Sequence, residues 1–280
     1  IAAEWVDARS CIKTDNCYRS APLNWEQTQS AIQDQIQGNV LKVTQGFIAS
    51  DMNNFTTTLG REGSDYTAAI FAYCLGATDV TIWKDVQGVL NADPRVFDKT
   101  QLLEHISYQE AIELAFYGAS VIHPKTLQPL QRKEIPLYVK SFLNPKQKGT
   151  KVGKGVPMQP EIPCYIVKKG LSLLRLSTRD FSFVVEDNIS DIFKLLHEHK
   201  MSVDVIQNSA ISFSVCVEDT YHKMDALLLA LRSRFDVKHT PDVSLYTIRH
   251  FEENSANTLL STHDLVLEQR TATTLQLVLK

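Results

Sequence analysis

The segment 56–65, with the sequence TTTLGREGSD, contains the residue types that most directly suggest chemistry. Hydroxyl side chains and two glycines lead into a predicted helix, whose first N–H groups and dipole favour a bound anion. Arg61 lies within this loop and could hold a carboxylate or phosphate through a two-pronged, charge-assisted hydrogen bond. A capped helix with a solvated arginine explains the pattern equally well, because the loop matches neither GxxxxGKS/T nor GxGxxG.

A second cluster of polar residues follows the predicted strand 80–83. Lys84 and Arg95 could neutralise phosphates, and Asp85 could accept a hydrogen bond from a ribose or an adenine amino group. A solvated turn of mixed charge is the alternative, and composition alone favours it. The third cluster, 118–124, has the sequence GASVIHP and resembles a helix end that enters a short connection. Its His123 is interpreted as a hydrogen-bonded structural residue without a chemical role.

The elements that must position these clusters alternate between strands and helices. Strands are predicted over 40–43, 80–83 and 135–142, and helices over 64–76 and 107–118. Such alternation indicates βαβ crossovers and a mostly parallel, buried sheet of an α/β protein. Ligands of these sheets collect at the carboxyl ends of the strands. We therefore expect Gly46 and the residues after it, together with Lys84 and Asp85, at the functional edge.

The character of the chain changes near residue 155. Residues 144–160 are rich in Lys, Gly and Pro and are predicted to form a linker or an exposed connection. The region that follows has a β-α-β-β-α-β pattern. Its predicted parts are a strand over 171–176, a helix capped by Asn188, strands over 202–206 and 211–217, a helix capped by Thr220, and a strand over 235–239. Strand-like runs over 243–248, 264–267 and 273–279 complete the chain, and the polar segment 252–261 between them is predicted to contain no helix.

Length and composition exclude several classes of protein. At about 150 residues per domain, 280 residues suggest two domains. A hydrophobic content of 44% is typical of a globular protein, and a net charge of −3 argues against nucleic-acid binding by counterion release. The longest apolar stretch, 68–77, is too short to cross a bilayer. Five widely spaced cysteines without a CxxC motif predict a reducing compartment, the cytoplasm.

The three clusters, in this order and spacing, resemble the aspartokinases of the amino-acid kinase superfamily. The matching segments are VTQGFIASD (43–51), TTLGREGSDYTAA (57–69), IWKDVQGVLNADPR (82–95), ISYQEAIELAFYGASVIHP (106–124) and IPLYVKSFLNP (135–145). The β-α-β-β-α-β region is similar to the ACT regulatory domains of this family.

The resemblance implies a fold and a division into domains. Residues 1–155 would be the C-terminal part of a carbamate kinase-like domain, a mostly parallel sheet with helices on both faces. Residues 156–280 would be a ferredoxin-like βαββαβ ACT region. Within that region, 171–240 would form the first ACT module, and 160–170 with 241–280 a second, degenerate one.

The resemblance also implies ATP-dependent phosphorylation of the side-chain carboxylate of L-aspartate, with Mg²⁺. A carboxylate nucleophile is already ionised at pH 7, so the reaction needs positioning and charge neutralisation rather than a general base. By similarity, Arg61 and Asp65 have catalytic roles, because Arg61 binds the α-carboxylate and Asp65 orients the substrate. Glu62, Gly63 and Ser64 would line the same pocket. The nucleotide-binding positions would be Lys84, Asp85, Leu90, Arg95, Ser120 and Val121, and no dedicated metal ligand is assigned.

Two features of the sequence differ from the family pattern. Lys84 stands where many relatives have Thr or Ser. Leu90 stands where many have Tyr, and Ser120 where many have Lys. The opening Lys-Phe-Gly-Gly motif and the later Gly-Glu-Leu segment of the family are not among these residues, which begin at Ile1. We therefore expect the chain to be a C-terminal fragment with little or no kinase activity of its own.

ACT domains in this family pair across a homodimer and bind an end-product amino acid, so a lysine or threonine effector is expected. By similarity its contacts would be Asn188, Ile189, Ser202, Val203, Asp204, Asn208 and Ser209. A helix cap and an acidic residue at a strand edge explain Asn188 and Asp204 equally well, and feedback is expected to be weak or altered. A non-catalytic amino-acid-sensing module on a kinase remnant is the alternative function. The intact TTLGREGSD loop favours the enzyme.

Overall fold

The computed structural model describes residues 1–155, 157–180 and 182–280. The chain divides into two compact units, Ile1–Ile162 (unit 1) and Pro163–Lys280 (unit 2). This division falls later than the expected boundary at residue 155. The boundary lies later because Gln159 is hydrogen-bonded to unit 1. Its N–H donates to His105 O over 2.9 Å, and its carbonyl accepts from Glu104 N over 2.7 Å. These bonds tie the connecting segment to unit 1.

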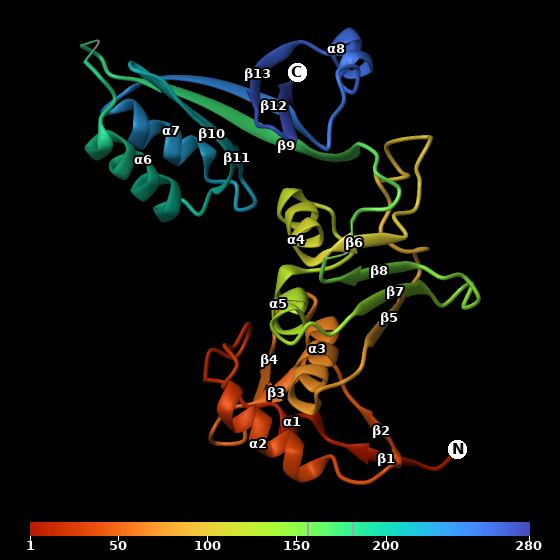
Figure 1. The fold of residues 1–280 in the computed structure, drawn as a ribbon. Coiled ribbons are helices and arrows are strands. Elements are labelled where there is room, and N and C mark those ends of the chain that lie inside the picture. Colours follow the sequence, from red (N-terminus) through yellow and green to blue (C-terminus); the bar gives the residue numbers. More distant parts are fainter. Residues whose placement is uncertain (156, 181) are drawn as a thin grey trace. The chain divides into compact units, whose positions relative to one another are not determined.

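Unit 1 begins with short elements around a small core. They are β1 (Ala3–Val6), α1 (Ala8–Cys11), α2 (Trp25–Gln35), β2 (Leu41–Thr44), β3 (Ile48–Ser50) and β4 (Thr56–Thr58) (Figure 1). β1 pairs with β2 in parallel, and β3 pairs with β4 in an antiparallel hairpin. Ile12, Ile32, Leu59 and Ile70 are almost fully buried between these elements and the next helix, α3 (Gly63–Leu75). Their burial fixes the hairpin against the helix that carries the candidate site.

The rest of unit 1 contains a four-stranded sheet. Its elements are α3 (Gly63–Leu75), β5 (Val80–Lys84), β6 (His105–Ser107), α4 (Tyr108–Tyr117), α5 (Pro124–Arg132), β7 (Leu137–Ser141) and β8 (Thr150–Gly153). The strand order is β5-β7-β8-β6. β5 pairs with β7 and β6 with β8 in parallel, whereas β7 and β8 are antiparallel. Parallel pairs thus predominate, as the α/β pattern predicts, with one antiparallel pair inside the sheet.

Local punctuation signals set the helix ends in unit 1. α3 ends at Gly76, whose φ of 61° is the left-handed conformation that glycine adopts at low cost. α4 ends before Gly118, whose N–H donates to the carbonyls of Ala115 and Leu114. The pattern missed α5, which begins where a connection was predicted. His123 caps it, because its Nδ1 accepts from Lys125 N over 3.1 Å, and this confirms the structural interpretation of His123.

Unit 2 is built on one antiparallel sheet of six strands. Its elements are β9 (Cys164–Ser177), α6 (Glu186–Glu198), β10 (Ser202–Asn208), β11 (Ser212–Glu218), α7 (Met224–Arg232), β12 (Asp236–Arg249), α8 (Asn257–Thr262), β13 (Leu265–Arg270) and β14 (Thr274–Leu279). The order in the sheet is β10-β11-β9-β12-β14-β13. α6 and α7 lie side by side on one face (Figure 1), where Ile192, Leu231 and Phe213 belong to one apolar core.

Two long strands run through both halves of this sheet. The strand predicted at 171–176 is part of a longer strand, β9, and those predicted at 235–239 and 243–248 are one strand, β12. Gly170 and Asp242 look like breaks in sequence, yet each is accommodated inside its strand with φ of 72° and 54°. The β9–β12 register shifts between Thr240 and Leu245, where the ladder is irregular. The two predicted ACT modules therefore share their central strands.

Three local predictions in unit 2 are wrong. Asn188 is not the residue that caps α6: the helix begins at Glu186, and the Asn188 side chain accepts from Val185 N instead. Thr220 does not cap α7, because the Asp219 carboxylate accepts from the N–H groups of Lys223 and Met224. The polar segment around 252–261 was predicted to lack a helix, but α8 occupies part of it. Six residues are too few to show helical periodicity.

The face of the sheet opposite α6 and α7 has its own apolar core, formed by Leu171, Leu173, Val205, Cys216, Val243, Leu245, Leu267 and Val278. The side chain of Gln207 on β10 donates to Glu268 O on β13 over 3.4 Å. The two edge strands therefore approach each other, and the sheet curls around this second core. In the described part of the chain, no helix is both long and apolar enough to cross a membrane.

Candidate functional site

The loop between β4 and α3 has a backbone conformation that opens the start of the helix. Gly60 and Glu62 both have positive φ, 80° and 53°, and Gly63 N donates to Gly60 O over 3.1 Å. Glu62 is the cap residue of α3, but its side chain makes no capping hydrogen bond. The first N–H groups of a thirteen-residue helix are thus left to another acceptor. A non-glycine residue in this conformation is under strain, which is often found at binding sites.

A second loop, at Gly46 and Phe47, packs directly on the helix start. A Cβ at Gly46 would lie 2.9 Å from the Ser64 Cα, so only glycine allows this approach. Phe47 N donates to Thr67 Oγ1 over 3.0 Å, and that hydroxyl donates to Gly63 O over 2.8 Å. The structure thus brings Gly46 to the site, as the strand pattern predicts.

The predicted substrate-binding side chains differ in burial. Arg61 and Ser64 are exposed, Glu62 and Asp65 are half-buried, and Gly63 is buried. Within residues 1–155, 157–180 and 182–280, the Arg61 guanidinium takes part in no hydrogen bond or ion pair. Glu62 Oε2 is buried without a hydrogen-bond partner in that same part of the chain. An unengaged guanidinium beside an open helix start is an arrangement that suits a carboxylate or a phosphate.

An ion pair joins the first cluster to the second. Lys84 Nζ lies 2.9 Å from Asp65 Oδ2, although the two groups are not aligned as a hydrogen bond. Their side chains are 22% and 15% exposed, so both are partly shielded from water. Lys84 is the last residue of β5, and Asp65 is in the first turn of α3. The carboxyl end of a strand and the start of a helix therefore meet here, as the α/β pattern predicts.

An open pocket of about 440 Å³ lies beside the start of α3. It is lined by Ile36, Lys42, Thr44, Gln45, Gly46, Ser64, Thr67, Ala68, Phe71 and Leu75. Its polar residues lie near Gly46 and Ser64, while Phe71 and Leu75 give it an apolar side. Lys42 forms an ion pair with Glu4. The pocket shares Ser64 with the candidate site.

The predicted nucleotide residues of the second cluster differ in their exposure to solvent. The Arg95 side chain donates to both oxygens of Asp93, with Nη2 to Oδ2 at 2.7 Å, and it is 83% exposed. The Arg95 side chain holds the pKa of the Asp93 carboxyl below its ordinary value. Leu90 is half-buried, and its backbone forms an isolated antiparallel β-bridge with Leu102. Asp85 is exposed beside Lys84. The structure places Arg95 in a surface pair that a nucleotide phosphate would have to displace.

The predicted nucleotide residues of the third cluster lie in the connection between α4 and α5. Ser120 is exposed and Val121 is half-buried. In the described part of the chain, no hydrogen bond joins either residue to Arg61, Lys84 or Arg95. Their place in the site thus rests on the sequence resemblance alone.

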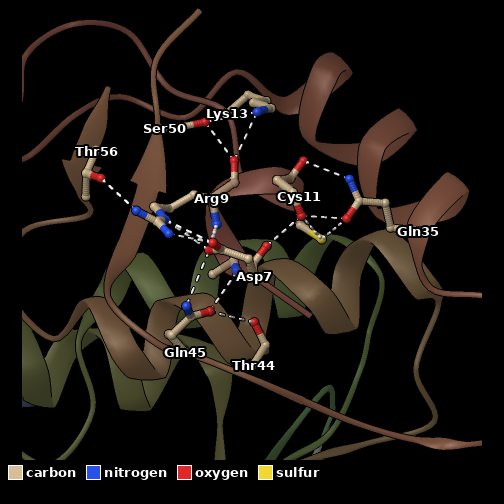
Figure 2. Close-up of polar contacts among 11 residues, drawn as sticks. Asp7, Arg9, Cys11, Lys13, Gln35, Thr44, Gln45, Ser50 and Thr56 are labelled. Atoms are coloured by element: carbon tan, nitrogen blue, oxygen red, sulfur yellow. Dashed lines mark hydrogen bonds and ion pairs between the residues drawn. The ribbon is translucent and has the colours of Figure 1, made fainter. Parts of the chain in front are cut away.

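Sequence reasoning missed a polar network at the start of the chain (Figure 2). The Arg9 side chain donates to both oxygens of Asp7, through Nε to Oδ1 and through Nη2 to Oδ2, and these bonds lower the pKa of the Asp7 carboxyl to about 2. Lys13 Nζ donates to Ser50 Oγ over 2.9 Å, and Arg9 Nη1 reaches Thr56 Oγ1 over 3.4 Å. The network ties α1 to the β3–β4 hairpin below the site. The Asp-x-Arg spacing of residues 7 and 9 was the local signal for it.

The predicted effector residues of unit 2 fall at two ends of β10. Val184 N donates to Ala210 O over 2.9 Å, which places the start of α6, with Asn188 and Ile189, beside the turn that contains Asn208 and Ser209. Ser202, Val203 and Asp204 begin the strand, about 13–20 Å from Asn208 at 3.3 Å per residue. Asp204 forms an ion pair with Lys168. The structure therefore does not bring the seven residues together within one chain.

Comparison with known proteins identifies the family. Residues 1–141 match the model of the amino acid kinase family, which is half of the chain. The chain belongs to this family. It is also 34% identical over 223 residues to lysine-sensitive aspartokinase 3 of Escherichia coli K12, covering 79% of this chain and 49% of that protein. The chain thus spans about half the length of this relative.

Solved structures give the same result. The structure of E. coli aspartokinase III in complex with lysine and aspartate has a TM-score of 0.79 and 29% identity, covering 99% of this chain and 66% of that chain. The structure of the same enzyme with aspartate and ADP has a TM-score of 0.79 and 28% identity, with the same coverage of 99% and 66%. The amino-acid kinase fold with an ACT-like region, predicted from sequence, is confirmed.

Proposed function

We propose that the chain is part of an aspartokinase, which transfers the γ-phosphoryl group of ATP to the side-chain carboxylate of L-aspartate. The observation that best supports this function is the open start of α3, with the unengaged Arg61 beside it and Gly46 held against Ser64. Its relatives with named activities are aspartokinases, and one of them is solved with aspartate and ADP. Phosphorylation of aspartate would be an early step in the synthesis of lysine, threonine and methionine.

The site residues would divide the work of binding the substrate. Arg61 would hold the α-carboxylate of aspartate, while the first amides of α3, at Gly63 and Ser64, would donate to an anionic oxygen. Asp65, held by Lys84, would orient the substrate. No side chain is needed to remove a proton, because the attacking carboxylate is ionised at neutral pH. The site therefore acts by positioning and by neutralising charge.

The nucleotide would lie along the second and third clusters, near Lys84, Leu90, Arg95, Ser120 and Val121. Magnesium usually binds through one or two carboxylates together with the phosphates. Asp85 fits this role, since it is exposed at the end of β5 and forms no ion pair in the described part of the chain. Bound Mg²⁺ would neutralise phosphate charge. Among the described residues, no group of three or more metal-binding side chains gathers elsewhere.

These 280 residues alone are expected to have little or no kinase activity. They lack both the Lys-Phe-Gly-Gly motif and the Gly-Glu-Leu segment of the family, so part of the charge neutralisation is not among them. Robust aspartate-dependent release of ADP by the purified chain would contradict this proposal.

Unit 2 would regulate the enzyme by binding lysine or threonine and would pair with a second copy of itself. Exposed apolar side chains at the start of α6 and along β10 and its turn support a homodimer: Phe183, Val185, Ile206 and Ile211. The free edge of β10 offers backbone groups for the same contact. All five cysteines are free, which supports a reducing compartment such as the cytoplasm.

Calorimetric titration tests the substrate site without requiring turnover. The chain should bind L-aspartate, and R61A should weaken binding roughly tenfold or more, because a charge-assisted hydrogen bond contributes about 1.5–3 kcal/mol. R95A is the matched control, since it should weaken ADP binding and leave the Kd for L-aspartate unchanged. Equal aspartate affinity in wild type and R61A would contradict the proposal. Amino-acid binding by unit 2 alone, without aspartate or ADP binding, would favour the sensing module.

A further inference from the structure

A largely buried lysine–aspartate pair crosses the sheet of unit 2. Lys168 Nζ donates to Asp204 Oδ1 over 2.5 Å, and the two side chains are 29% and 7% exposed. Lys168 is on β9 and Asp204 is on β10, and β11 lies between these strands. The segment of β9 that pairs with β11 begins at Ser172, so Lys168 reaches Asp204 from the part of β9 that precedes Gly170. The contact therefore joins the two halves of the sheet.

The backbone around Asp204 aims its carboxylate into the second core. The β10–β11 register shifts between Val203 and Val205, so Asp204 is the additional residue of a bulge, a feature that redirects side chains. Cys216 pairs with Val205 and lies within electrostatic reach of this carboxylate. Burial raises the pKa of its thiol to about 12, and the Asp204 charge contributes to the rise. The carboxylate thus lies against apolar surface rather than in water.

One oxygen of this carboxylate has no hydrogen-bond partner in the described part of the chain. Asp204 Oδ2 is buried and accepts no hydrogen bond from any described residue. An ionised carboxylate has about four acceptor positions, and a buried one is costly to leave incompletely satisfied. Lys168 therefore satisfies this carboxylate incompletely, and an ammonium that donates to both oxygens would satisfy it better.

The ammonium of Lys168 is chemically equivalent to that of a free amino acid or an alkylamine. Each presents three N–H donors and one positive charge. Lys168 reaches Asp204 on a flexible chain that is partly open to solvent, so the pair can be broken and replaced.

We propose that Lys168 is a built-in competitor for an ammonium site at Asp204, so that a primary amine or the amino group of a free amino acid binds there only by displacing it. This inference rests on the proposed sensing role of unit 2 for the identity of the ligand. It does not depend on kinase activity. The pair weakens the response to a free amino acid, which agrees with the altered feedback expected from sequence.

The experiment is a calorimetric titration of the full 280-residue chain with L-lysine and with n-butylammonium chloride. K168M keeps the length of the side chain and removes its charge, and it should bind at least one probe about tenfold more tightly than wild type. D204N should abolish this gain in K168M. K169M is the matched control, because Lys169 is the exposed neighbour, and it should behave as wild type. Equal affinities in K168M and wild type would overturn the inference, as would a gain that survives D204N.

Loss of folding in K168M would still test the inference. Without Lys168, the Asp204 carboxylate would be a buried charge without a counterion. Added n-butylammonium should therefore restore folding of K168M, and K168M/D204N should fold without it. Failure of both would overturn the proposal.

The two proposals for unit 2 can fail separately. Binding of n-butylammonium to K168M without binding of L-lysine or L-threonine would keep the Asp204 site and contradict the sensing function. Binding of L-lysine to wild type with a Kd that neither K168M nor D204N changes would keep the sensing function and overturn this inference.

Discussion

The two units use the same chemical pair, a lysine with an aspartate, in opposite ways. In unit 1, Lys84 holds Asp65 at the start of α3, and the Arg61 beside them remains exposed. In unit 2, Lys168 forms an ion pair with Asp204, whose side chain is 7% exposed, and no described group donates to the second oxygen of this carboxylate. The first pair leaves its neighbourhood open to an anion, whereas the second occupies a place where a cation would bind.

This difference shows that the sign and the accessibility of the remaining charge decide what a site accepts. Around α3, the helix dipole and Arg61 leave positive potential after the pair has formed. Around Asp204, the second core is apolar, and among the described residues no further group donates to the second oxygen of the carboxylate. Burial also makes the second pair more important for stability, since an uncompensated charge costs more where water is excluded.

Among variants that remove one partner of these pairs, K168M is expected to lower the stability of its unit the most. Breaking a buried pair costs about 3–5 kcal/mol, and the partial exposure of Lys168 reduces the expected loss to about 2 kcal/mol. All three tryptophans are in unit 1, so amide hydrogen exchange of β10 and β11 in urea is the suitable measurement. K169M should change these exchange rates little. A loss in K168M as small as that in K169M would contradict the burial argument.

K84M should have a smaller effect, about 1 kcal/mol, on the free energy of unfolding of unit 1. Asp65 keeps the favourable N-terminal position in α3 after its partner is lost, and its side chain is closer to water than that of Asp204. Tryptophan fluorescence during urea unfolding checks the value, with K99M as the exposed control. A loss larger than that of K168M would reverse the comparison between the units.

The Asp7–Arg9 pair sharpens the comparison through its dependence on pH. Its folded-state pKa of about 2 lies below the ordinary 3.8, so its stabilisation is present above pH 3.8 and is lost as the pH falls through 2. Carboxyl NMR shifts of Asp7 should therefore titrate with a midpoint near 2, and R9M should return the midpoint toward 3.8. An unchanged midpoint in R9M would show that Arg9 is not the cause.

The smallest effect is expected for R95A, because the Arg95 side chain is 83% exposed. The midpoint of thermal unfolding should stay unchanged, while the pKa of Asp93 should rise toward its ordinary value. Circular dichroism and NMR titration measure the two quantities. A clear drop in the midpoint would mean that the loop contributes to the stability of unit 1.

Local signals predicted what depends on neighbouring residues. The end of α3 at Gly76 and the structural role of His123 follow from residues within one turn, and both predictions are confirmed. The loop 56–65 was also placed correctly at a helix start. Its left-handed Glu62 was not predicted, because no pattern of residue types marks a strained glutamate.

Nonlocal contacts explain the failures. Asp65 and Lys84 are brought together by the return of the chain along β5, which spacing cannot show. Gly170 suggests a break in sequence, but β12 pairs with β9 both before Gly170, at Lys168, and after it, at Leu171, and so keeps β9 a single strand. The start of α7 depends on Asp219, whose carboxylate competes with Thr220 for the same role. In each case a tertiary or side-chain contact overrode the local preference.

The continuity of β12 has a consequence for attempts to dissect unit 2. Because Asp236–Arg249 pairs with β9 along its length and with β14 at its end, cutting the chain near residue 241 would split one strand between two products. Neither product would fold as an independent domain, since each would keep only part of the shared central strand. Chimaeras of this unit should therefore exchange it whole, from Pro163 to Lys280.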